Sequence, residues 1–247
     1  YEKYITYKLK GLNMKKIIFS IVLMLCFGFN ANAEKGINAG LTLLYGEFSV
    51  DGATEKFAAN HSSGAGSARD VKHSDEGDDA TGEFALASIF VEKAINDRFS
   101  IGLDYVPVSA ESETTENEQN KAGSNPATHS GDAAGTNKVQ VDFEDLTTLY
   151  AMINLGPMYV KAGLMTVDVV TNESLATGGS YGNTSLDGTM FAVGMDRDLD
   201  NGAFIRLEGT VMDFDGASLT NQNDSTKSVK VDGISGYGAR ISVGKSF

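Results

Sequence analysis

The sequence predicts an all-β protein, an eight-stranded antiparallel up-and-down transmembrane β-barrel preceded by a signal peptide. Segments in which apolar residues alternate with small or polar residues recur through residues 34–247, as in strands with one lipid-facing side. The links between these segments are alternately short and long, and the last residue is aromatic, Phe247. Helical periodicity is not sustained anywhere in this region. Ten strands are the alternative, if a long link contains a further hairpin.

Residues 1–33 are expected to lie outside the barrel. Two lysines follow Met14, then come an apolar stretch over residues 17–29 and the sequence Ala-Asn-Ala at 31–33. This order is typical of a secretory signal peptide, and the apolar stretch is shorter than the roughly 20 residues that a membrane-spanning helix needs. The expected organisation is therefore an upstream extension over residues 1–13, a signal peptide over 14–33 and the barrel over 34–247.

Composition excludes several function classes. Residues 1–33 hold five basic residues and one acidic residue, so residues 34–247 carry a formal net charge of −17. Nucleic-acid binding needs a basic surface, so no nucleic-acid partner is expected. The one cysteine, Cys26, falls in the predicted signal peptide. Thiolate chemistry and cysteine-ligated metals are therefore not expected in the barrel, and no cofactor is predicted.

Each predicted strand is justified by an apolar face of period two. In the first four segments the apolar faces comprise Ile37, Ala39, Leu41, Leu43 and Tyr45; Ala85, Ala87, Ile89 and Val91; Phe99, Ile101, Leu103 and Tyr105; and Leu149, Ala151, Ile153 and Leu155. In the next three they comprise Met158, Val160, Ala162 and Leu164; Phe191, Val193 and Met195; and Ala203, Ile205, Leu207 and Val211. The eighth segment spans residues 229–247, with Tyr237, Ile241 and Val243 on its apolar face and Phe247 as its last residue.

The links alternate in length. Short links at residues 94–97, 156–157 and 199–202 contain turn-forming residues, which suit tight hairpins. The long links are expected at residues 51–82, 111–137, 172–186 and 215–226. Short turns at one end and long loops at the other are typical of an up-and-down transmembrane barrel.

Charged side chains fall on the faces predicted to point inward. They are Asp104, Lys161, Asp196, Arg206, Glu208 and Arg240. A charge facing lipid at the bilayer midplane costs about 2–4 kcal/mol, so this segregation favours a membrane barrel over a soluble lipocalin-like barrel. Two interpretations stay open: a hydrogen-bonded ionic network that fills the lumen, and the lining of a narrow channel.

The cleavage motif, the eight alternating segments and the terminal Phe247 together resemble the small bacterial outer-membrane β-barrel proteins, the class of the OmpA transmembrane domain and OmpX. The resemblance implies a bacterial outer-membrane location with both termini in the periplasm. It also implies outer-membrane lipid, lipopolysaccharide and the barrel-assembly machinery as partners, with Tyr237, Ile241, Val243 and Phe247 as the C-terminal barrel-assembly signal. Lys245 departs from this pattern, because an apolar or aromatic residue is usual at its place in the last strand.

The long links offer two further candidate sites. Asp75, Glu76, Asp78 and Asp79 form a possible divalent-cation loop, or simply a solvated acidic loop. Three histidines, His61, His73 and His129, are each followed by serine, the residue types that a catalytic site at the outer rim would need. A flexible loop does not hold such a pair rigidly, so the protein is not expected to be an enzyme.

The expected function is therefore a structural or surface-interaction role through long acidic outer loops, with extracellular ligands as candidate partners. The alternative is a narrow porin-like channel for small solutes or ions. A third hypothesis is an outer-rim enzyme that modifies lipid A.

Overall fold

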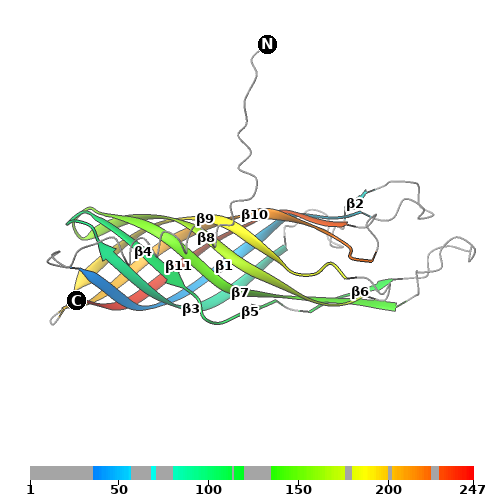
Figure 1. The fold of residues 1–247 in the computed structure, drawn as a ribbon, viewed down its shortest axis with the longest axis horizontal. Coiled ribbons are helices and arrows are strands. Elements are labelled where there is room, and N and C mark those ends of the chain that lie inside the picture. The colour runs from blue at the N-terminus through cyan, green and yellow to red at the C-terminus, as the bar shows by residue number, and fades with distance from the viewer. Residues whose placement is uncertain are drawn as a thin grey trace, which may run out of the picture. The chain divides into compact units, whose positions relative to one another are not determined.

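The fold is a closed antiparallel β-barrel formed within the compact unit Lys35–Phe247. The computed structural model describes residues 36–56, 68–70, 80–112, 114–119, 135–175, 180–199, 202–223 and 228–247. Figure 1 shows the strands running obliquely along the barrel. Within the described ranges no helix is long and apolar enough to cross a membrane.

Eight long strands make the barrel wall, and three short strands extend it at one end. The wall strands are β1 (Ile37–Lys56), β3 (Ala80–Ala94), β4 (Phe99–Tyr105), β7 (Gly135–Asn154), β8 (Met158–Ser174), β9 (Thr184–Asp198), β10 (Ala203–Thr220) and β11 (Ser228–Ser246). The short strands are β2 (Ala68–Asp70), β5 (Ala110–Glu111) and β6 (Thr115–Gln119).

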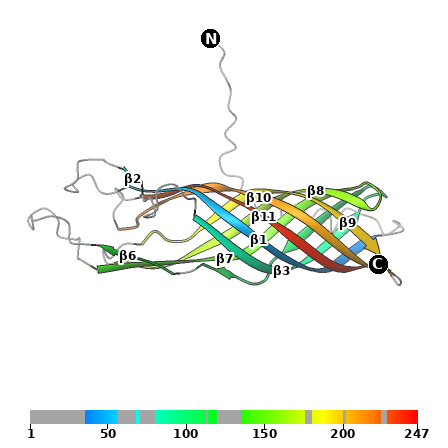
Figure 2. The ribbon, with the colours of Figure 1, turned by 180° about the vertical axis from the view of Figure 1, so that it is seen from behind.

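The wall strands pair with their sequence neighbours in the order β1, β3, β4, β7, β8, β9, β10 and β11. The first and last strands close the barrel by pairing along most of their length, from Asn38 with Ser246 to Lys56 with Ser228 (Figure 2). The predicted all-β, eight-stranded, up-and-down fold is thus confirmed. The ten-stranded alternative is wrong, because the barrel closes with eight strands and β2, β5 and β6 each pair with a single wall strand.

The three short links form tight turns at the end of the barrel where the C-terminus lies. The Asn96 side chain accepts hydrogen bonds from the backbone N–H groups of Arg98 and Phe99, both at 2.9 Å. Gly156 and Gly202 adopt φ values of 86° and 76°, a left-handed conformation that glycine reaches without steric cost. The residues that predicted these links are therefore the residues that make the turns.

The strands extend further than the alternation predicts at the opposite end. The expected long links began at Asp51, Asn172 and Asp215, but β1, β8 and β10 continue to Lys56, Ser174 and Thr220. These extensions stay hydrogen-bonded to neighbouring strands. Polar residues are tolerated there because the alternating lipid-facing pattern is needed only within the hydrocarbon layer.

The outer surface of the barrel carries a broad apolar belt. Its large exposed side chains include Leu41, Leu43, Tyr45, Ile89, Val91, Phe99, Met158, Phe191, Val193, Met195, Leu207, Val211, Tyr237, Ile241 and Val243. Polar groups fill much of the interior at the same level, so the barrel is apolar outside and polar inside. This is the distribution of a transmembrane β-barrel.

A substitution at Leu207 tests this placement, because its side chain is 52% exposed and lies between Ile205 and Val211 on the apolar face of β10. Replacing it with arginine is expected to lower the free energy of unfolding by about 2–4 kcal/mol. The measurement is urea unfolding of the chain folded into phospholipid vesicles. The control is Asp213→Arg, on the same face of the same strand beyond the belt, which should change the unfolding free energy little. Equal effects of the two substitutions would contradict the placement.

Candidate functional site in the lumen

The structure brings all six predicted inward charges into the lumen. They project from five strands: Asp104 from β4, Lys161 from β8, Asp196 from β9, Arg206 and Glu208 from β10, and Arg240 from β11. Five of them are buried, whereas the side chain of Asp196 is 29% exposed. The period of two places Arg206, Glu208 and Thr210 on one face of β10, so a single strand presents both signs of charge to the interior.

Arg206 and Glu92 form the lower ion pair of the lumen. Two parallel hydrogen bonds join them, from Nη1 to Oε2 at 2.9 Å and from Nη2 to Oε1 at 3.1 Å. Glu92 also accepts from Asn38 Nδ2 at 2.9 Å and from the Tyr150 hydroxyl at 3.2 Å. Asp196 Oδ2 lies 3.8 Å from Arg206 Nε. The fork of the guanidinium thus matches the carboxylate, the geometry of a strong charge-assisted pair.

Glu208 joins the other two cations. Its Oε2 atom lies 2.5 Å from Lys161 Nζ and accepts from the Tyr159 hydroxyl at 2.9 Å, while Oε1 lies 3.3 Å from Arg240 Nε. Arg240 Nη2 also donates to Asp104 Oδ2 at 2.5 Å. Three buried cations are therefore balanced by three buried carboxylates, as low-dielectric burial of charge requires.

Aromatic rings frame these cations. Lys161 Nζ lies 4.6 Å from the ring centroid of Tyr150 and 5.6 Å from that of Tyr159. The Arg206 guanidinium carbon lies 4.6 Å from the centroid of Phe204. Each distance is within the range of a cation–π contact. The rings therefore contribute attraction to the cations and occupy the space between them.

Glycines on neighbouring strands leave room for these rings. A Cβ atom at Gly194 would lie 2.4 Å from the Tyr159 ring, and one at Gly102 would lie 2.3 Å from the Tyr150 ring. Both distances are shorter than real Cβ contacts allow. The glycines therefore set where the two tyrosine rings lie, and with them the hydroxyls that donate to Glu92 and Glu208.

Gly194→Ala is expected to lower the free energy of unfolding by about 1–3 kcal/mol, because the added methyl group overpacks against the fully buried Tyr159 ring. Gly209→Ala is the matched control, since nothing lies within 4 Å of a Cβ atom there. Urea unfolding in vesicles measures both variants. If Gly194→Ala is no more destabilising than the control, Tyr159 does not occupy the position described.

All eight wall strands contribute a side chain to this network. Beside the five strands already named, Asn38 comes from β1, Glu92 from β3 and Tyr150 from β7. An eight-stranded barrel is only wide enough for side chains to fill. We call this set the lumen network: Asn38, Glu92, Asp104, Tyr150, Tyr159, Lys161, Asp196, Arg206, Glu208 and Arg240.

Four members of the lumen network were not among the predicted site residues: Asn38, Glu92, Tyr150 and Tyr159. The alternation of β3 already places Glu92 on the inward face with Phe90, and a charge on that face was the signal that could have found it. The tyrosines gave no comparable signal, because an inward aromatic residue is more often simply packed in the core.

The other predicted site residues lie elsewhere or outside the described residues. The residues of the C-terminal signal, Tyr237, Ile241, Val243 and Phe247, are exposed on the outer face of β11 and just beyond its end. Asp75, Glu76, Asp78 and Asp79 lie outside the described ranges, as do His61, His73 and His129. Within the described ranges, no cluster of three or more histidine, cysteine, aspartate or glutamate side chains could hold a metal ion.

Comparisons with known proteins find similarity only among solved structures, since no protein-family model and no curated protein sequence matches. One is Ail, the attachment invasion locus protein of Yersinia pestis, in complex with the heparin analogue sucrose octasulfate; the match has 10% identity and a TM-score of 0.35 over 87% of this chain and 100% of that one. Another is outer membrane protein AlkL in DMPC lipid bilayers, with 13% identity and a TM-score of 0.42 over 89% and 95%. A third is the outer membrane protease OmpT from Escherichia coli, with 11% identity and a TM-score of 0.35 over 88% and 99%. At such identities the likeness concerns the fold alone.

Proposed function

Because the chain forms a small eight-stranded barrel of the outer-membrane type, we propose that it acts as a structural and surface-interaction protein of the bacterial outer membrane and does not conduct ions or solutes. The observation that carries this proposal is the lumen network, to which every wall strand contributes. A channel needs a water-filled path lined by polar groups. Here the polar groups are paired with one another instead.

Burial of the ions supports the closed lumen. The side chains of Glu92, Arg206, Glu208, Lys161 and Arg240 are each at most 7% exposed. An ion crossing at this level would have to displace the Arg206–Glu92 pair or the contacts around Glu208, and each displacement leaves a buried charge without its partner. The network is therefore proposed to serve as a fixed filling of the barrel.

The orientation follows from the two ends of the barrel. Outer-membrane barrels have short periplasmic turns and longer extracellular loops, so we assign the end with the three tight turns and the C-terminus to the periplasm. The long acidic links then face outward, where lipopolysaccharide, divalent cations and extracellular ligands are available. The C-terminal strand is assigned to recognition by the barrel-assembly machinery.

The proposed role is not enzymatic. The His-Ser pairs at residues 61–62, 73–74 and 129–130 lie in the long links, and the polar groups of the lumen network are engaged with one another. If the protein instead modified lipid A, replacing the three histidines with alanine would abolish a change in the lipid A of cells that express it. Mass spectra of lipid A identical with and without the protein are expected.

Cells that lack the protein provide the direct test of the surface role. They would express either the full chain or a chain in which residues 71–79, which include four acidic residues, and residues 120–134 are replaced by short Gly-Ser turns. The full chain is expected to increase attachment of the cells to a lipopolysaccharide-coated surface, and the shortened chain is expected to lose most of this increase while folding equally well on a heat-modifiability gel. Equal attachment by both chains would refute the role of the loops.

A further inference from the structure

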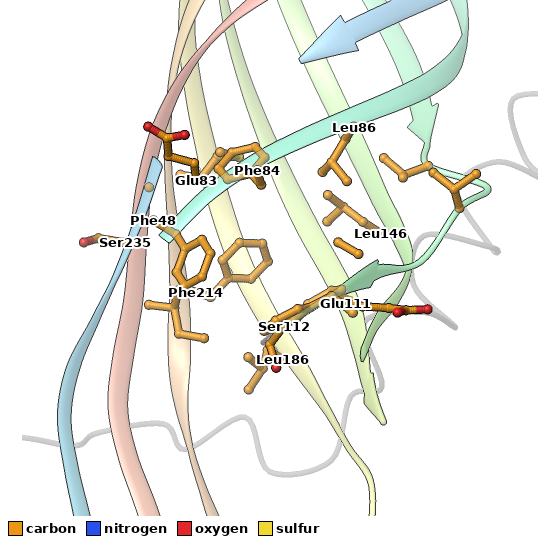
Figure 3. A pocket seen from close by; sticks show the side chains of 18 residues that line it. Phe48, Glu83, Phe84, Leu86, Glu111, Ser112, Leu146, Leu186, Phe214 and Ser235 are labelled. Carbon is orange, nitrogen blue, oxygen red and sulfur yellow. The ribbon is translucent and has the colours of Figure 1, made fainter. Parts of the chain in front are cut away.

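An apolar pocket occupies the outer half of the barrel, above the lumen network. Its volume is about 130 Å³. Seven wall strands and the segment after β4 line it. Phe84, Leu86, Leu146, Leu186 and Phe214 are among the lining side chains, and Figure 3 shows them facing one another across the cavity. The floor includes Met212, which packs with the buried cluster that contains Tyr150 and Tyr159.

The pocket lies beside a gap in the hydrogen-bonded wall. Pairing between β3 and β4 ends at Ile89 and Tyr105, although β3 continues to Ala80 and stays paired there with β1. The chain after Tyr105 turns to β7 instead: the Val106 N–H donates to Leu146 O at 2.9 Å, and β5 pairs with Phe143 and Asp142. Among the described residues, β3 from residue 80 to 88 therefore has a hydrogen-bonded neighbour on one side only.

A local irregularity in β7 accounts for this gap. The register between β7 and β8 shifts between Glu144 and Thr147, and Asp145 adopts a positive φ of 55°. The Tyr105 hydroxyl donates to Asp145 Oδ1 at 2.6 Å, which ties the end of β4 to this bulge. Bulges bend a strand and end its regular pairing, so the segment after β4 is drawn away from β3.

Apolar groups flank the gap on both sides. The outward residues of β3 at this level include Ala85 and Ala87, which pair with Tyr45 and Leu43 of the apolar belt. On the opposite border Val108 is 50% exposed and also lines the pocket. An unpaired strand edge facing lipid is costly. Because Ala85 and Ala87 lie next to Tyr45 and Leu43, the gap borders the apolar belt, and we infer that an apolar molecule dissolved in the membrane can reach the pocket there.

The volume of the pocket and the charges of its lining residues limit the class of ligand that it can bind. A dry cavity of about 150 Å³ lined by aliphatic and aromatic side chains accommodates benzene, so this pocket suits a molecule of about six carbon atoms. The only charged residues that line it are Glu83 and Glu111, whose carboxylates point away from its centre (Figure 3). No cation is present among the lining residues to pair with an anionic ligand, so an ionised fatty acid would enter without compensation.

We propose that this pocket binds a small neutral apolar molecule, a monocyclic aromatic or short hydrocarbon, that enters from the outer leaflet through the gap between β3 and the segment after β4. The lumen network below closes the way to the periplasm. The site is therefore a binding pocket open to the side of the barrel, in addition to the surface role of the loops.

A single-tryptophan variant tests the proposal, because the chain contains no tryptophan. Phe214→Trp places the reporter in the pocket wall, and Phe191→Trp places one on the lipid-facing surface. The full chain is folded into phosphatidylcholine vesicles and titrated with nitrobenzene, a neutral quencher of suitable size. Quenching should saturate for Phe214→Trp and rise linearly for Phe191→Trp, where the quencher only partitions into lipid.

Two further measurements complete the experiment: competition by a second ligand and a substitution that fills the pocket. Toluene should relieve the saturable quenching, and hexanoate should need an at least about tenfold higher concentration. Adding Ala110→Phe, which fills the pocket, should remove saturation, whereas Ala162→Phe on the lipid-facing side of β8 should not.

Three results would overturn the proposal. One is linear quenching at both reporter positions, and another is saturation that survives Ala110→Phe. The third is saturation that appears only after deletion of residues 120–134, because the pocket would then belong to that segment of the chain.

Discussion

Replacing Arg206 with alanine is expected to lower the free energy of unfolding of the barrel by about 3–5 kcal/mol, the usual cost of breaking a buried ion pair from one side. The Glu92 side chain is fully buried, and Arg206 provides two of its hydrogen bonds. Without the guanidinium, Glu92 keeps only Asn38 and Tyr150 as hydrogen-bond donors. Urea unfolding in vesicles, followed by circular dichroism, measures the loss.

Two controls separate this effect from a general loss of charge. Lys138→Ala breaks the Lys138–Glu116 pair, whose side chains are 51% and 54% exposed, and should cost less than about 1 kcal/mol. The double variant Arg206→Met with Glu92→Leu removes both charges together and should recover much of the lost stability. If Arg206→Ala costs no more than Lys138→Ala, the buried pair described here does not exist in the membrane.

Removing the Arg206–Glu92 pair as a unit is expected to open the lumen. Glu92→Ser combined with Arg206→Ser removes one carboxylate and one cation together and frees the volume of two long side chains, and Asp196 loses the nearby Arg206 guanidinium. Water can then solvate the remaining polar groups at this level, Asn38, Tyr150 and Asp196. In a planar bilayer, the double variant should give discrete current steps that increase with salt concentration.

The matched control for this prediction is Thr42→Ala combined with Ser242→Ala. These two lumen hydroxyls are joined by a 2.8 Å hydrogen bond, and removing them frees little volume and breaks no ion pair. This variant should remain silent. Conductance by the control, or silence of the Glu92 and Arg206 double variant when it is folded, would show that the pair is not what closes the barrel.

Much of the fold was predictable because a membrane barrel imposes its pattern locally. Lipid on one face and lumen on the other force a period of two along each strand, as from Ile37 to Tyr45 in β1. Gly156 and Pro157 mark one of the tight turns. The strand ends opposite the tight turns were not predictable in this way. Strands β1 and β10 continue past Asp51 and Asp215, where the apolar alternation has ended and strand pairing keeps the chain extended.

The lumen network was predictable as a set of inward charges but not as a set of pairs. Alternation assigns Arg206 to the interior, yet the partner that it meets there, Glu92, lies 114 positions away in the sequence. Which inward side chains meet depends on the register of every strand pair around the barrel, and a single sequence does not specify that register. The sequence therefore predicts which charges point inward and that they can form an ionic network, but not which of them pair.

The sequence analysis did not predict the apolar pocket. It depends on where β3 and β4 cease to pair and on the bulge around Asp145, both of which are tertiary features. One local signal was present: Pro107 follows the end of β4 and has no backbone N–H to donate to a continuing ladder. Proline at that point indicates a strand end but does not reveal the cavity behind it.

The most direct test of the closed lumen is the single-channel conductance of the unmodified barrel, residues 34–247, folded into a planar bilayer. Folding is confirmed beforehand by heat modifiability on a gel. Because the lumen network joins side chains from all eight wall strands, we expect no discrete current steps at any salt concentration. Regular steps that scale with salt concentration, and that change when Arg206 or Glu208 is replaced, would contradict it and identify the protein as a narrow channel.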